Sequence, residues 1–335
     1  LFAPAGLPSP AERRRTWPSA ASFRDLSSPR LKGQSHGWEP WLLALFALLL
    51  LALALRAVPL SVHRFHEDEA LYVSWALLTA EDPALISVPV DKPPLYIYLL
   101  AGLFRLLGPS ELVARLPNLF GSVVSVALLY GIGRRAYDRP TALVAATLYA
   151  ASPFAILFAP TAFTDPLLVL WMLLGLWAAL AQKPLLVGFA LGLAYATKQQ
   201  SLLLVPLVVA ASVLGGVKEN GRGRGEAALF GFLPLFGLVT WWDSLRWHVQ
   251  PSFWDRSLAT YGGLTLLPLS AWPERLADWA QLLGYVFASP PLNVTLLIGL
   301  SLLLWTALRQ HATRFTFHVS RFTFHASRST FHDFF

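Results

Sequence analysis

Cysteine is absent from this chain of 335 residues, so disulfide bonds and thiolate metal sites are excluded. Charged residues are scarce as well, at 13% of the sequence, whereas hydrophobic residues make up 55%. One soluble domain cannot cover that much apolar material with its own polar surface. Several apolar runs of about 18 or more residues lack charge, which is typical of membrane spans. The composition therefore predicts an all-α, polytopic membrane protein.

Methionine is nearly absent: residue 1 is Leu, and the single methionine is Met172. We therefore expect N-terminal residues to be missing and the chain to be a gene fragment. Residues 1–40 are rich in Pro, Ser and Arg without apolar periodicity, which predicts a disordered cytoplasmic tail.

The other end, residues 309–335, carries a seven-residue near-repeat that reads RFTFHVS, RFTFHAS, RSTFHDF from residue 314. Its apolar pattern is too short for a coiled coil. The three regularly spaced histidines permit a metal site, but we interpret the repeat as translated repetitive DNA and assign it no function. The domain between the tails, 41–308, is expected to be a truncated transmembrane domain.

Apolar stretches predict eight transmembrane helices, at 41–60, 113–133, 140–158, 166–182, 184–198, 201–217, 226–242 and 291–308. A ninth stretch, 94–108, has about 15 residues and contains Arg105, so it is shorter than the ~20 residues that a span needs. We expect it to lie along the membrane surface within a long first outer loop that carries juxtamembrane helices.

The distribution of charge fixes the orientation of these helices. With both termini in the cytoplasm, the inner segments hold 17 of the 26 Lys and Arg residues. The outer segments hold 9, against 12 Asp and Glu. This asymmetry follows the positive-inside rule. The net charge of +7 is therefore interpreted as a topology signal, and nucleic-acid binding is not expected.

An acidic run, Glu67, Asp68 and Glu69, follows the first predicted span in the sequence RFHEDEALYVSWALL. It is not the zinc motif HExxH, because Ala70 stands where the second histidine is needed. Two readings remain open for this run by itself. It forms a carboxylate site for a hard cation beside His63 and His66, or it is a solvated turn above the membrane.

Three further ionisable residues lie near predicted span ends: Lys92 before two prolines, Asp165 before Pro166, and Lys198. Each has a structural explanation, since a lysine can extend to the headgroups and Thr164 with Asp165 can cap a helix. Ionisable groups at such places are nevertheless candidates for function.

The predicted topology puts two carboxylates, Asp68 and Asp165, and two cations, Lys92 and Lys198, on the outer face. Such a set suits group transfer from a lipid phosphate: the cations balance the leaving phosphate, and a carboxylate orients or deprotonates the attacking hydroxyl.

Five motifs occur in order along the chain: DEALY, KPPLYIYLL, ARLPNLFGS, TDPLL and ATKQ. The set resembles the polytopic glycosyltransferases of the C-type fold, specifically the dolichyl-phosphate-mannose protein mannosyltransferase-like superfamily, which includes the bacterial aminoarabinose transferases acting on lipid A. The resemblance covers residues 41 to about 215 well and 226–308 loosely.

This resemblance implies a polyprenyl-phosphate sugar as donor, an acceptor hydroxyl on lipid, glycan or protein outside the cytoplasm, and inversion at the sugar carbon. It implies catalytic roles for the acidic residues Asp68, Glu69 and Asp165. It implies contacts with the donor phosphate for the basic residues Lys92, Lys198 and Arg115. It also implies a place in the bacterial inner membrane, and it leaves a divalent cation open.

Family members usually continue for several more spans, whereas this chain gives way to the repeat after residue 308. Two alternatives to a transferase therefore remain. A transporter or flippase also uses intramembrane charges, although no matching pair of segments is evident here. The second alternative is that the chain is an inactive fragment of a transferase.

Overall fold

The computed structural model describes residues 40–61, 64–214, 221–261, 268–285, 291, 293–299, 301–302 and 305. The chain divides into two compact units, Leu1–Leu43 and Ala44–Phe335. Within the described ranges every regular element is a helix, so the all-α prediction is confirmed. The predicted tail 1–39, His63, the repeat after 308 and part of the predicted span 291–308 lie outside the described residues.

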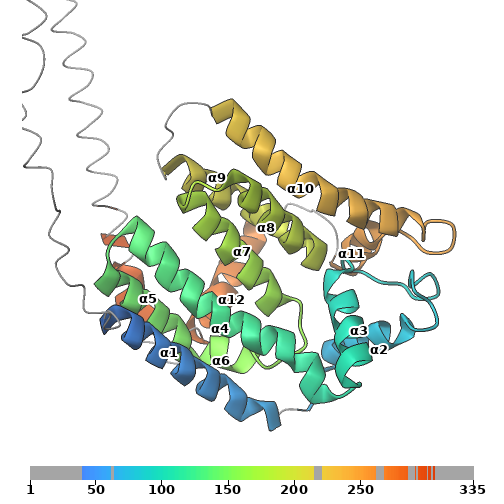
Figure 1. Cartoon of the computed structure of the whole chain (residues 1–335), viewed down its shortest axis with the longest axis horizontal. Helices are drawn as coiled ribbons and strands as arrows, with labels where there is room; N and C mark the ends of the chain where they lie inside the picture. Colours follow the sequence, from blue (N-terminus) through green and yellow to red (C-terminus); the bar gives the residue numbers. More distant parts are fainter. Residues whose placement is uncertain are drawn as a thin grey trace, which may run out of the picture. The chain divides into compact units, whose positions relative to one another are not determined.

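The helices follow one another in the order labelled in Figure 1. The bounds of those in the first half are α1 (Pro40–Ala57), η3 (Val58–Ser61), α2 (Glu67–Leu78), α3 (Leu95–Leu107), α4 (Glu111–Ala136), α5 (Arg139–Ala151) and α6 (Pro153–Phe158). Those in the second half are α7 (Asp165–Leu180), α8 (Pro184–Thr197), η4 (Gln199–Leu204), α9 (Val205–Leu214), α10 (Gly221–Ser244), α11 (Phe253–Tyr261), η5 (Leu269–Ala271) and α12 (Trp272–Tyr285).

Three helices in the described residues are long and apolar enough to cross a membrane: Pro40–Leu60, Glu111–Ala136 and Gly223–Ser244. Four shorter apolar helices occupy 95–107, 165–180, 184–197 and 199–212. The 16 residues of α7 and the 14 of α8 give helices of about 24 and 21 Å, short of a hydrocarbon core of about 30 Å. Helix length therefore supports three spans, and the predicted number of eight stays a prediction.

The predicted span 140–158 is two helices because Pro153 interrupts it. A residue before proline is disfavoured in helical conformation, and Ser152 is extended, with ψ of 119°. Its hydroxyl then accepts a hydrogen bond of 3.5 Å from the amide of Ala155 and so caps α6. The predicted span 201–217 also differs from the structure. Its first residues belong to the 3-10 helix η4, and the α-helix α9 starts only at Val205.

Small residues let the helices of the bundle approach closely. A methyl group at Gly188 of α8 would lie 1.8 Å from the carbonyl oxygen of Ala228 on α10, and one at Gly231 would lie 2.3 Å from the carbonyl oxygen of Leu185. Gly188 and Gly192 are four residues apart, which is the spacing of close helix packing in membranes. The α8–α10 pair is therefore in backbone contact.

A fully buried arginine, Arg56, ties α1 to two other helices. Its Nε donates to the hydroxyl of Ser122 on α4 at 2.8 Å, and Nη1 donates to the carbonyl of Ala150 at 2.9 Å. Nη2 donates to the carbonyl of Tyr149 at 3.1 Å. A buried cation is tolerated only with such partners, so this arginine fixes α1 against α4 and α5.

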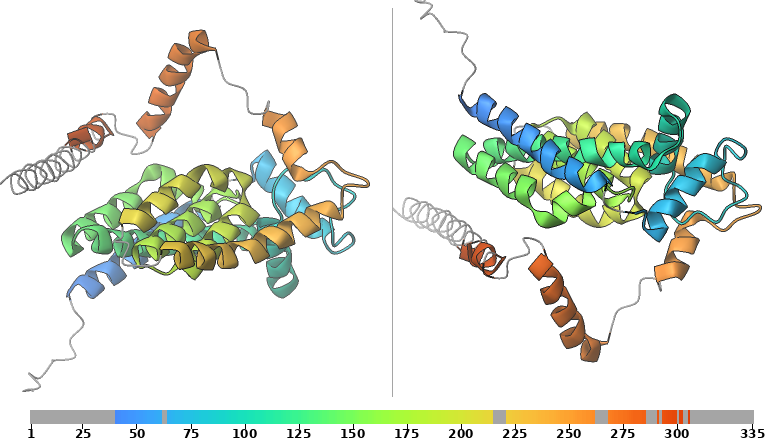
Figure 2. Two further views of the ribbon diagram at one scale, coloured as in Figure 1. Left: turned by 90° about the horizontal axis from the view of Figure 1, so that it is seen from above. Right: turned by 90° about the horizontal axis from the view of Figure 1, so that it is seen from below.

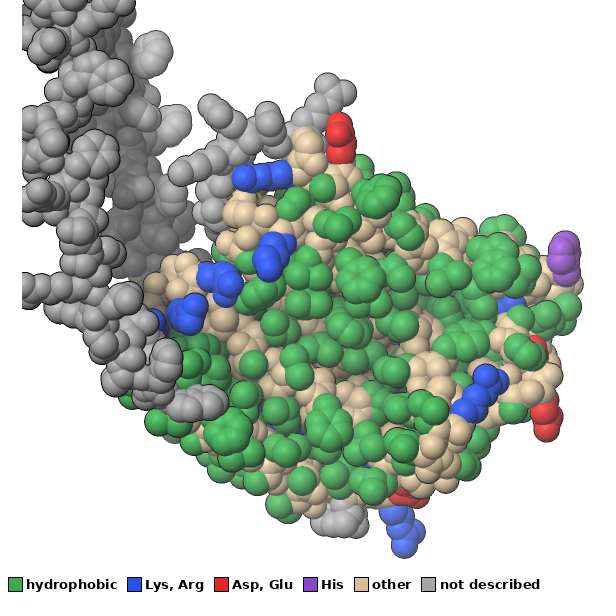
Figure 3. Space-filling model, viewed as in Figure 1, with side chains coloured by type: hydrophobic (Ala, Val, Ile, Leu, Met, Phe, Trp, Pro, Cys, Tyr) green, Lys and Arg blue, Asp and Glu red, His purple; other side chains and the backbone are tan. Residues whose placement is uncertain are grey.

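The bundle within 44–335 has two ends of different character (Figure 2). The starts of α4 and α7 and the ends of α8 and α10 meet α2, α3 and α11, and we name this the loop end. The opposite end carries most of the basic helix-end residues, Arg134, Arg135, Arg139, Lys183 and Arg224, and we name it the basic end. In Figure 3 a row of Lys and Arg side chains follows one margin of a broad apolar face.

Candidate functional site

The acidic run begins a helix rather than forming a solvated turn. His66 is the N-cap of α2, and its Nδ1 accepts a hydrogen bond of 3.3 Å from the amide of Asp68. The carboxylate of Glu69 reaches back and accepts from the amide of His66 at 2.8 Å. Three carboxylates in a first helical turn are also favoured by the helix dipole. Local helix formation thus explains why acidic residues occur here. It leaves Glu67 and Asp68 exposed and turns Glu69 into the protein.

Glu69 turns inward and braces α2 against two other segments. Its side chain is buried, and its Oε1 accepts a hydrogen bond of 2.6 Å from the amide of Ala162, just before α7. The same oxygen lies 3.6 Å from Nε of Arg115 on α4. The sequence predicts a catalytic Glu69; the structure gives this carboxylate contacts that hold the site's framework together.

Arg115, a predicted phosphate ligand, is also buried. Its Nη1 donates to the carbonyl of Leu60 at 3.0 Å, and its guanidinium lies over the ring of Phe65 at 4.9 Å. Among the described residues, two of its nitrogens, Nε and Nη2, have no hydrogen-bond partner. The guanidinium therefore pairs with Glu69 of α2, and its Nε and Nη2 remain available as donors.

Lys92 is buried at the start of the segment that leads into α3. Its ammonium donates to the carboxylate of Asp91 and, at 3.1 Å, to the hydroxyl of Tyr261 on α11. Burial lowers the pKa of Lys92, but these two hydrogen bonds and the charge of Asp91 outweigh it, so the pKa is raised overall. The ammonium thus stays charged at neutral pH.

Asp165 and Lys198 form an ion pair. Asp165 is the first residue of α7, and one of its oxygens lies 2.7 Å from Nζ of Lys198, which ends α8 in an extended conformation. Thr164 makes no capping hydrogen bond with its side chain, so the capping alternative does not account for this pair. The neighbouring Gln199 donates to the backbone carbonyl of Asp91 at 3.1 Å and connects this pair to the Lys92 segment.

The hydroxyl of Tyr72 is the point that these groups share. Burial raises the pKa of Tyr72 above its ordinary value, and the nearby carboxylates of Asp91, Asp68 and Asp165 raise it further, together with Tyr261. Three carboxylates from three separate segments therefore lie within electrostatic range of one phenol. We name this group the acidic site, composed of Asp68, Tyr72, Asp91, Lys92, Asp165, Lys198 and Tyr261.

Four of the six predicted residues belong to the acidic site: Asp68, Lys92, Asp165 and Lys198. The other two, Glu69 and Arg115, form the buried pair beneath it. Three members were not predicted, and the sequence offers a signal for only two of them. Asp91 directly precedes Lys92, and Tyr72 follows Asp68 by four residues, one helical turn. Tyr261 comes 169 residues after Lys92 and carries no local signal.

The cation site that the acidic run left open has no ligand cluster in the part of the chain that the structure describes. There, no three or more His, Asp or Glu side chains are arranged to hold a metal ion. His66 is engaged as the helix cap, and its ring lies 5.5 Å from that of Phe163.

An apolar pocket with a volume of about 480 Å³ lies between α3, the end of α8 and the second half of α10. Pro94 and Ala196, which line it, are two residues from Lys92 and Lys198, respectively. Trp241, Trp242 and Leu238 of α10 form its far wall. The lining thus offers space for an apolar chain between α3, α8 and α10.

The fold and the site together define a helical protein with membrane-type apolar helices and a charged cluster at one bundle end. Residues 91–241 match the family described as dolichyl-phosphate-mannose-protein mannosyltransferase. That stretch contains Lys92, Arg115, Asp165 and Lys198, and it begins after Asp68 and Glu69. This part of the chain is thus similar to the family that the ordered motifs predicted.

Among curated proteins, the chain is similar to the undecaprenyl phosphate-alpha-4-amino-4-deoxy-L-arabinose arabinosyl transferase of Yersinia enterocolitica serotype O:8 / biotype 1B, strain NCTC 13174 / 8081. The two are 27% identical over an alignment of 236 positions, and the match covers 64% of this chain and 41% of that protein. Among solved structures, it is similar to the S. cerevisiae protein O-mannosyltransferase Pmt1-Pmt2 complex bound to the sugar donor. That match has a TM-score of 0.47 and 16% identity, and it covers 63% of this chain and 34% of the other.

Proposed function

We propose that the chain is a membrane glycosyltransferase, or the N-terminal part of one, that moves a sugar from a polyprenyl-phosphate donor to an acceptor hydroxyl on a lipid, glycan or protein. The observation that carries this proposal is the convergence of Asp68 and Asp165 with the cations Lys92 and Lys198 around Tyr72. Its relation to the mannosyltransferase-like family supports the same reaction class.

In the proposed reaction, the acceptor oxygen attacks the sugar carbon while the bond from that carbon to the phosphate oxygen breaks. Asp68, which is exposed, orients the acceptor hydroxyl and takes up its proton. Polyprenyl phosphate leaves, and Lys92 and Lys198 balance its charge. One displacement of this kind inverts the sugar carbon. Asp165 holds Lys198 in place through their ion pair.

Glu69 and Arg115 are assigned positioning roles in this scheme. A buried carboxylate that already accepts two backbone amides has little capacity left for a substrate. Its pairing with Arg115 fixes the first turn of α2, and Asp68 is the adjacent residue of that turn. The apolar pocket lined by Pro94, Ala196 and Trp242 is proposed to receive the first isoprene units of the donor.

The proposed topology has eight spans, cytoplasmic termini and an extracytoplasmic loop end, in the bacterial inner membrane. The basic residues at the opposite end support it. Because the chain lacks cysteine, single cysteines report the orientation directly. Glu81→Cys at the loop end should react with an impermeant maleimide in intact cells, and Arg134→Cys at the basic end should react only after permeabilisation.

Transfer is tested with membranes that contain the full chain and a radiolabelled polyprenyl-phosphate sugar. Label should move to a lipid, glycan or protein fraction, and the matching nucleotide sugar should not replace the donor. A series of donors that differ in the sugar identifies the sugar class by which donor is used. The labelled fraction identifies the acceptor.

The transporter alternative makes a different prediction for the same membranes. Uptake of substrate into vesicles that depends on Lys198 and needs no sugar lipid would favour it. An inactive fragment would show neither reaction, and the chain spans only 41% of the curated relative's length. Joining the chain to the remaining length of that relative would then test whether the missing part limits activity.

A further inference from the structure

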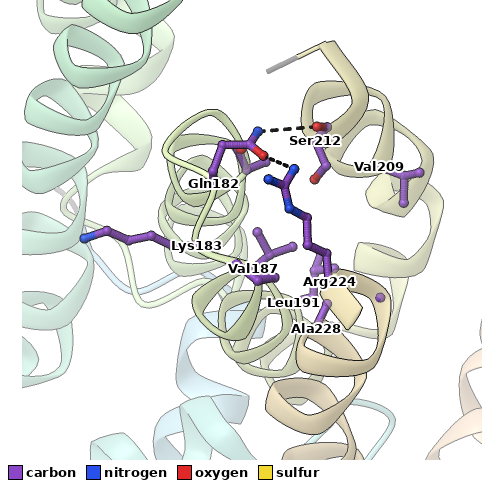
Figure 4. A pocket seen from close by; sticks show the side chains of 11 residues that line it. Gln182, Lys183, Val187, Leu191, Val209, Ser212, Arg224 and Ala228 are labelled. Carbon is purple, nitrogen blue, oxygen red and sulfur yellow. Dashed lines mark hydrogen bonds between the residues drawn. The ribbon is translucent and has the colours of Figure 1, made fainter. Parts of the chain in front are cut away.

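A second pocket lies at the basic end, far along the helices from the acidic site. It has a volume of about 310 Å³, at the low end of the ~300–1,000 Å³ typical of ligand pockets. The end of α7, the following turn, α8, α9 and the start of α10 enclose it (Figure 4). The proposed transfer reaction makes no use of this pocket.

The pocket changes from polar at the helix ends to apolar inside. Its polar lining side chains, Gln182, Ser212 and Arg224, come from helix ends or turns at the basic end. On α8, Val187 and Leu191 follow Lys183 at intervals of four residues, so they line one face at increasing depth. Eight residues of helix correspond to about 12 Å. The pocket is thus a slot along the helix axes, and a single apolar chain fits its size and direction.

Arg224 stands at the polar mouth, in the first turn of α10, which contains no acidic residue. A cation is disfavoured there by the helix dipole, whereas an anion is favoured. Its Nη1 donates to Oε1 of Gln182, and a guanidinium has four further N–H donors. Lys183 does not share this role, because its ammonium points away from the pocket to the ring of Trp177, at 5.2 Å.

Gln182 holds the mouth in shape at an energetic cost. Its φ of +56° is in the left-handed region, which is strained for a residue other than glycine. Its side-chain amide donates to the carbonyls of Ala179 at 3.0 Å and Ser212 at 3.5 Å while its oxygen accepts from Arg224. A glycine would remove the strain but also this link between α7, α9 and α10, so the side chain has a use here.

We propose that this pocket binds one acyl chain of an anionic phospholipid, with the lipid phosphate held by the guanidinium of Arg224. The charge at the mouth complements a phosphate, and arginine binds phosphate through paired hydrogen bonds. The apolar slot complements the chain attached to it. The inference requires that the bundle lies in a membrane, but it does not depend on the proposed reaction at the acidic site.

The test uses the delipidated full chain in detergent and native mass spectrometry, with phosphatidylglycerol and phosphatidylcholine that carry the same acyl chains. The wild-type chain should retain one phosphatidylglycerol at concentrations at which phosphatidylcholine is not retained. Arg224→Gln removes the charge at similar length and should weaken phosphatidylglycerol binding at least about tenfold. The matched control, Arg134→Gln, changes an exposed arginine at the same end and should bind as the wild type does.

Filling the slot tests the acyl-chain part of the inference. Leu191→Trp should weaken phosphatidylglycerol binding as strongly as Arg224→Gln does. If that variant fails to fold, Val209→Trp, at an exposed position of α9, fills the same slot from the other wall. Equal binding of the two lipids by the wild-type chain, or unchanged phosphatidylglycerol binding by either kind of variant, would overturn the proposal. Asp68→Asn should leave lipid binding unchanged, which separates this test from that of the transferase.

Discussion

The carboxylate of Asp165 accepts a hydrogen bond of 2.7 Å from the ammonium of Lys198, 33 residues later in the sequence. The pair joins the start of α7 to the end of α8 beside Tyr72. Asp165 is about half exposed, with 52% of its side chain accessible, so an exposed pair of this kind contributes at most about 1 kcal/mol to stability. Its placement in the acidic site therefore points to function rather than to stability.

Neutralising this pair should affect transfer far more than folding. We expect Asp165→Asn and Lys198→Met each to lower kcat/KM at least about 100-fold, which is the scale of lost electrostatic stabilisation. The melting temperature in detergent should change little, because an exposed pair contributes at most about 1 kcal/mol to stability. Because the residues act as a unit, the double variant should be little worse than either single one. Strictly multiplicative losses would contradict this coupling.

The buried pair of Glu69 and Arg115 should show the opposite balance. Glu69→Gln removes the buried counter-charge of Arg115, leaving only the exposed Glu111 at 3.8 Å, and loses one accepted amide hydrogen bond. We therefore expect a loss of about 3–5 kcal/mol in unfolding free energy. Glu67→Gln, at the exposed neighbour, should change it by less than about 0.5 kcal/mol. Equilibrium unfolding of the detergent-solubilised chain measures both.

The folded fraction of Glu69→Gln distinguishes positioning from mere stability. If Glu69 positions Asp68, kcat should fall about 10- to 100-fold while the donor KM stays nearly constant. An unchanged kcat for the folded fraction would mean that Glu69 has a structural role alone.

Close packing of α8 on α10 predicts a difference between two glycines. Gly188→Ala would put a methyl group 1.8 Å from the carbonyl oxygen of Ala228, so the helices must separate, at a cost of at least about 1–3 kcal/mol. Gly237→Ala, in α10, meets no atom of the described residues within 4 Å and should be neutral or stabilising by up to about 1 kcal/mol. Thermal unfolding of the two variants side by side is the measurement; equal melting temperatures would refute the contact.

The raised pKa of Tyr72 predicts a loss of stability in alkaline solution. Burial and the nearby carboxylates raise this pKa in the folded chain above the value of about 10 in the unfolded chain. The unfolded state therefore releases the phenolic proton first, and the stability that is present below pH 10 is lost as the pH rises through the folded-state pKa. Between pH 8 and 11, the wild-type chain should lose more unfolding free energy than Tyr72→Phe. Parallel pH curves would show that Tyr72 is solvated.

The helical fold was accessible from the sequence because apolar runs and charge placement are local signals. The helix break at Pro153 was also visible in the sequence, because proline disfavours a helical residue before it. A prediction from hydropathy alone ignores this signal and joins 140–158 into one span. The number of spans could not be settled in this way, since α7 and α8, with 16 and 14 residues, are shorter than the apolar runs 166–182 and 184–198 that predict them. The residue at which a helix ends within an apolar run depends on caps and turns, such as the turn at Gln182 with its left-handed backbone.

The acidic site was partly accessible for the same reason. Asp68, Lys92, Asp165 and Lys198 stand out as charges in apolar surroundings. The inward turn of Glu69 could not be predicted, because it depends on the amide of Ala162 and on Arg115, which lie far away in the sequence. Tyr261 likewise reaches Lys92 only through the tertiary fold.

The central claim is that Asp68 carries out the proton transfer of a glycosyl transfer reaction. The most direct measurement compares Asp68→Asn with Glu67→Gln, its exposed neighbour in the same helical turn, in membranes given a radiolabelled polyprenyl-phosphate sugar. We expect Asp68→Asn to lower transfer at least about 100-fold, on the scale of general-base catalysis, while Glu67→Gln transfers as the wild-type chain does. Undiminished transfer by Asp68→Asn would contradict it.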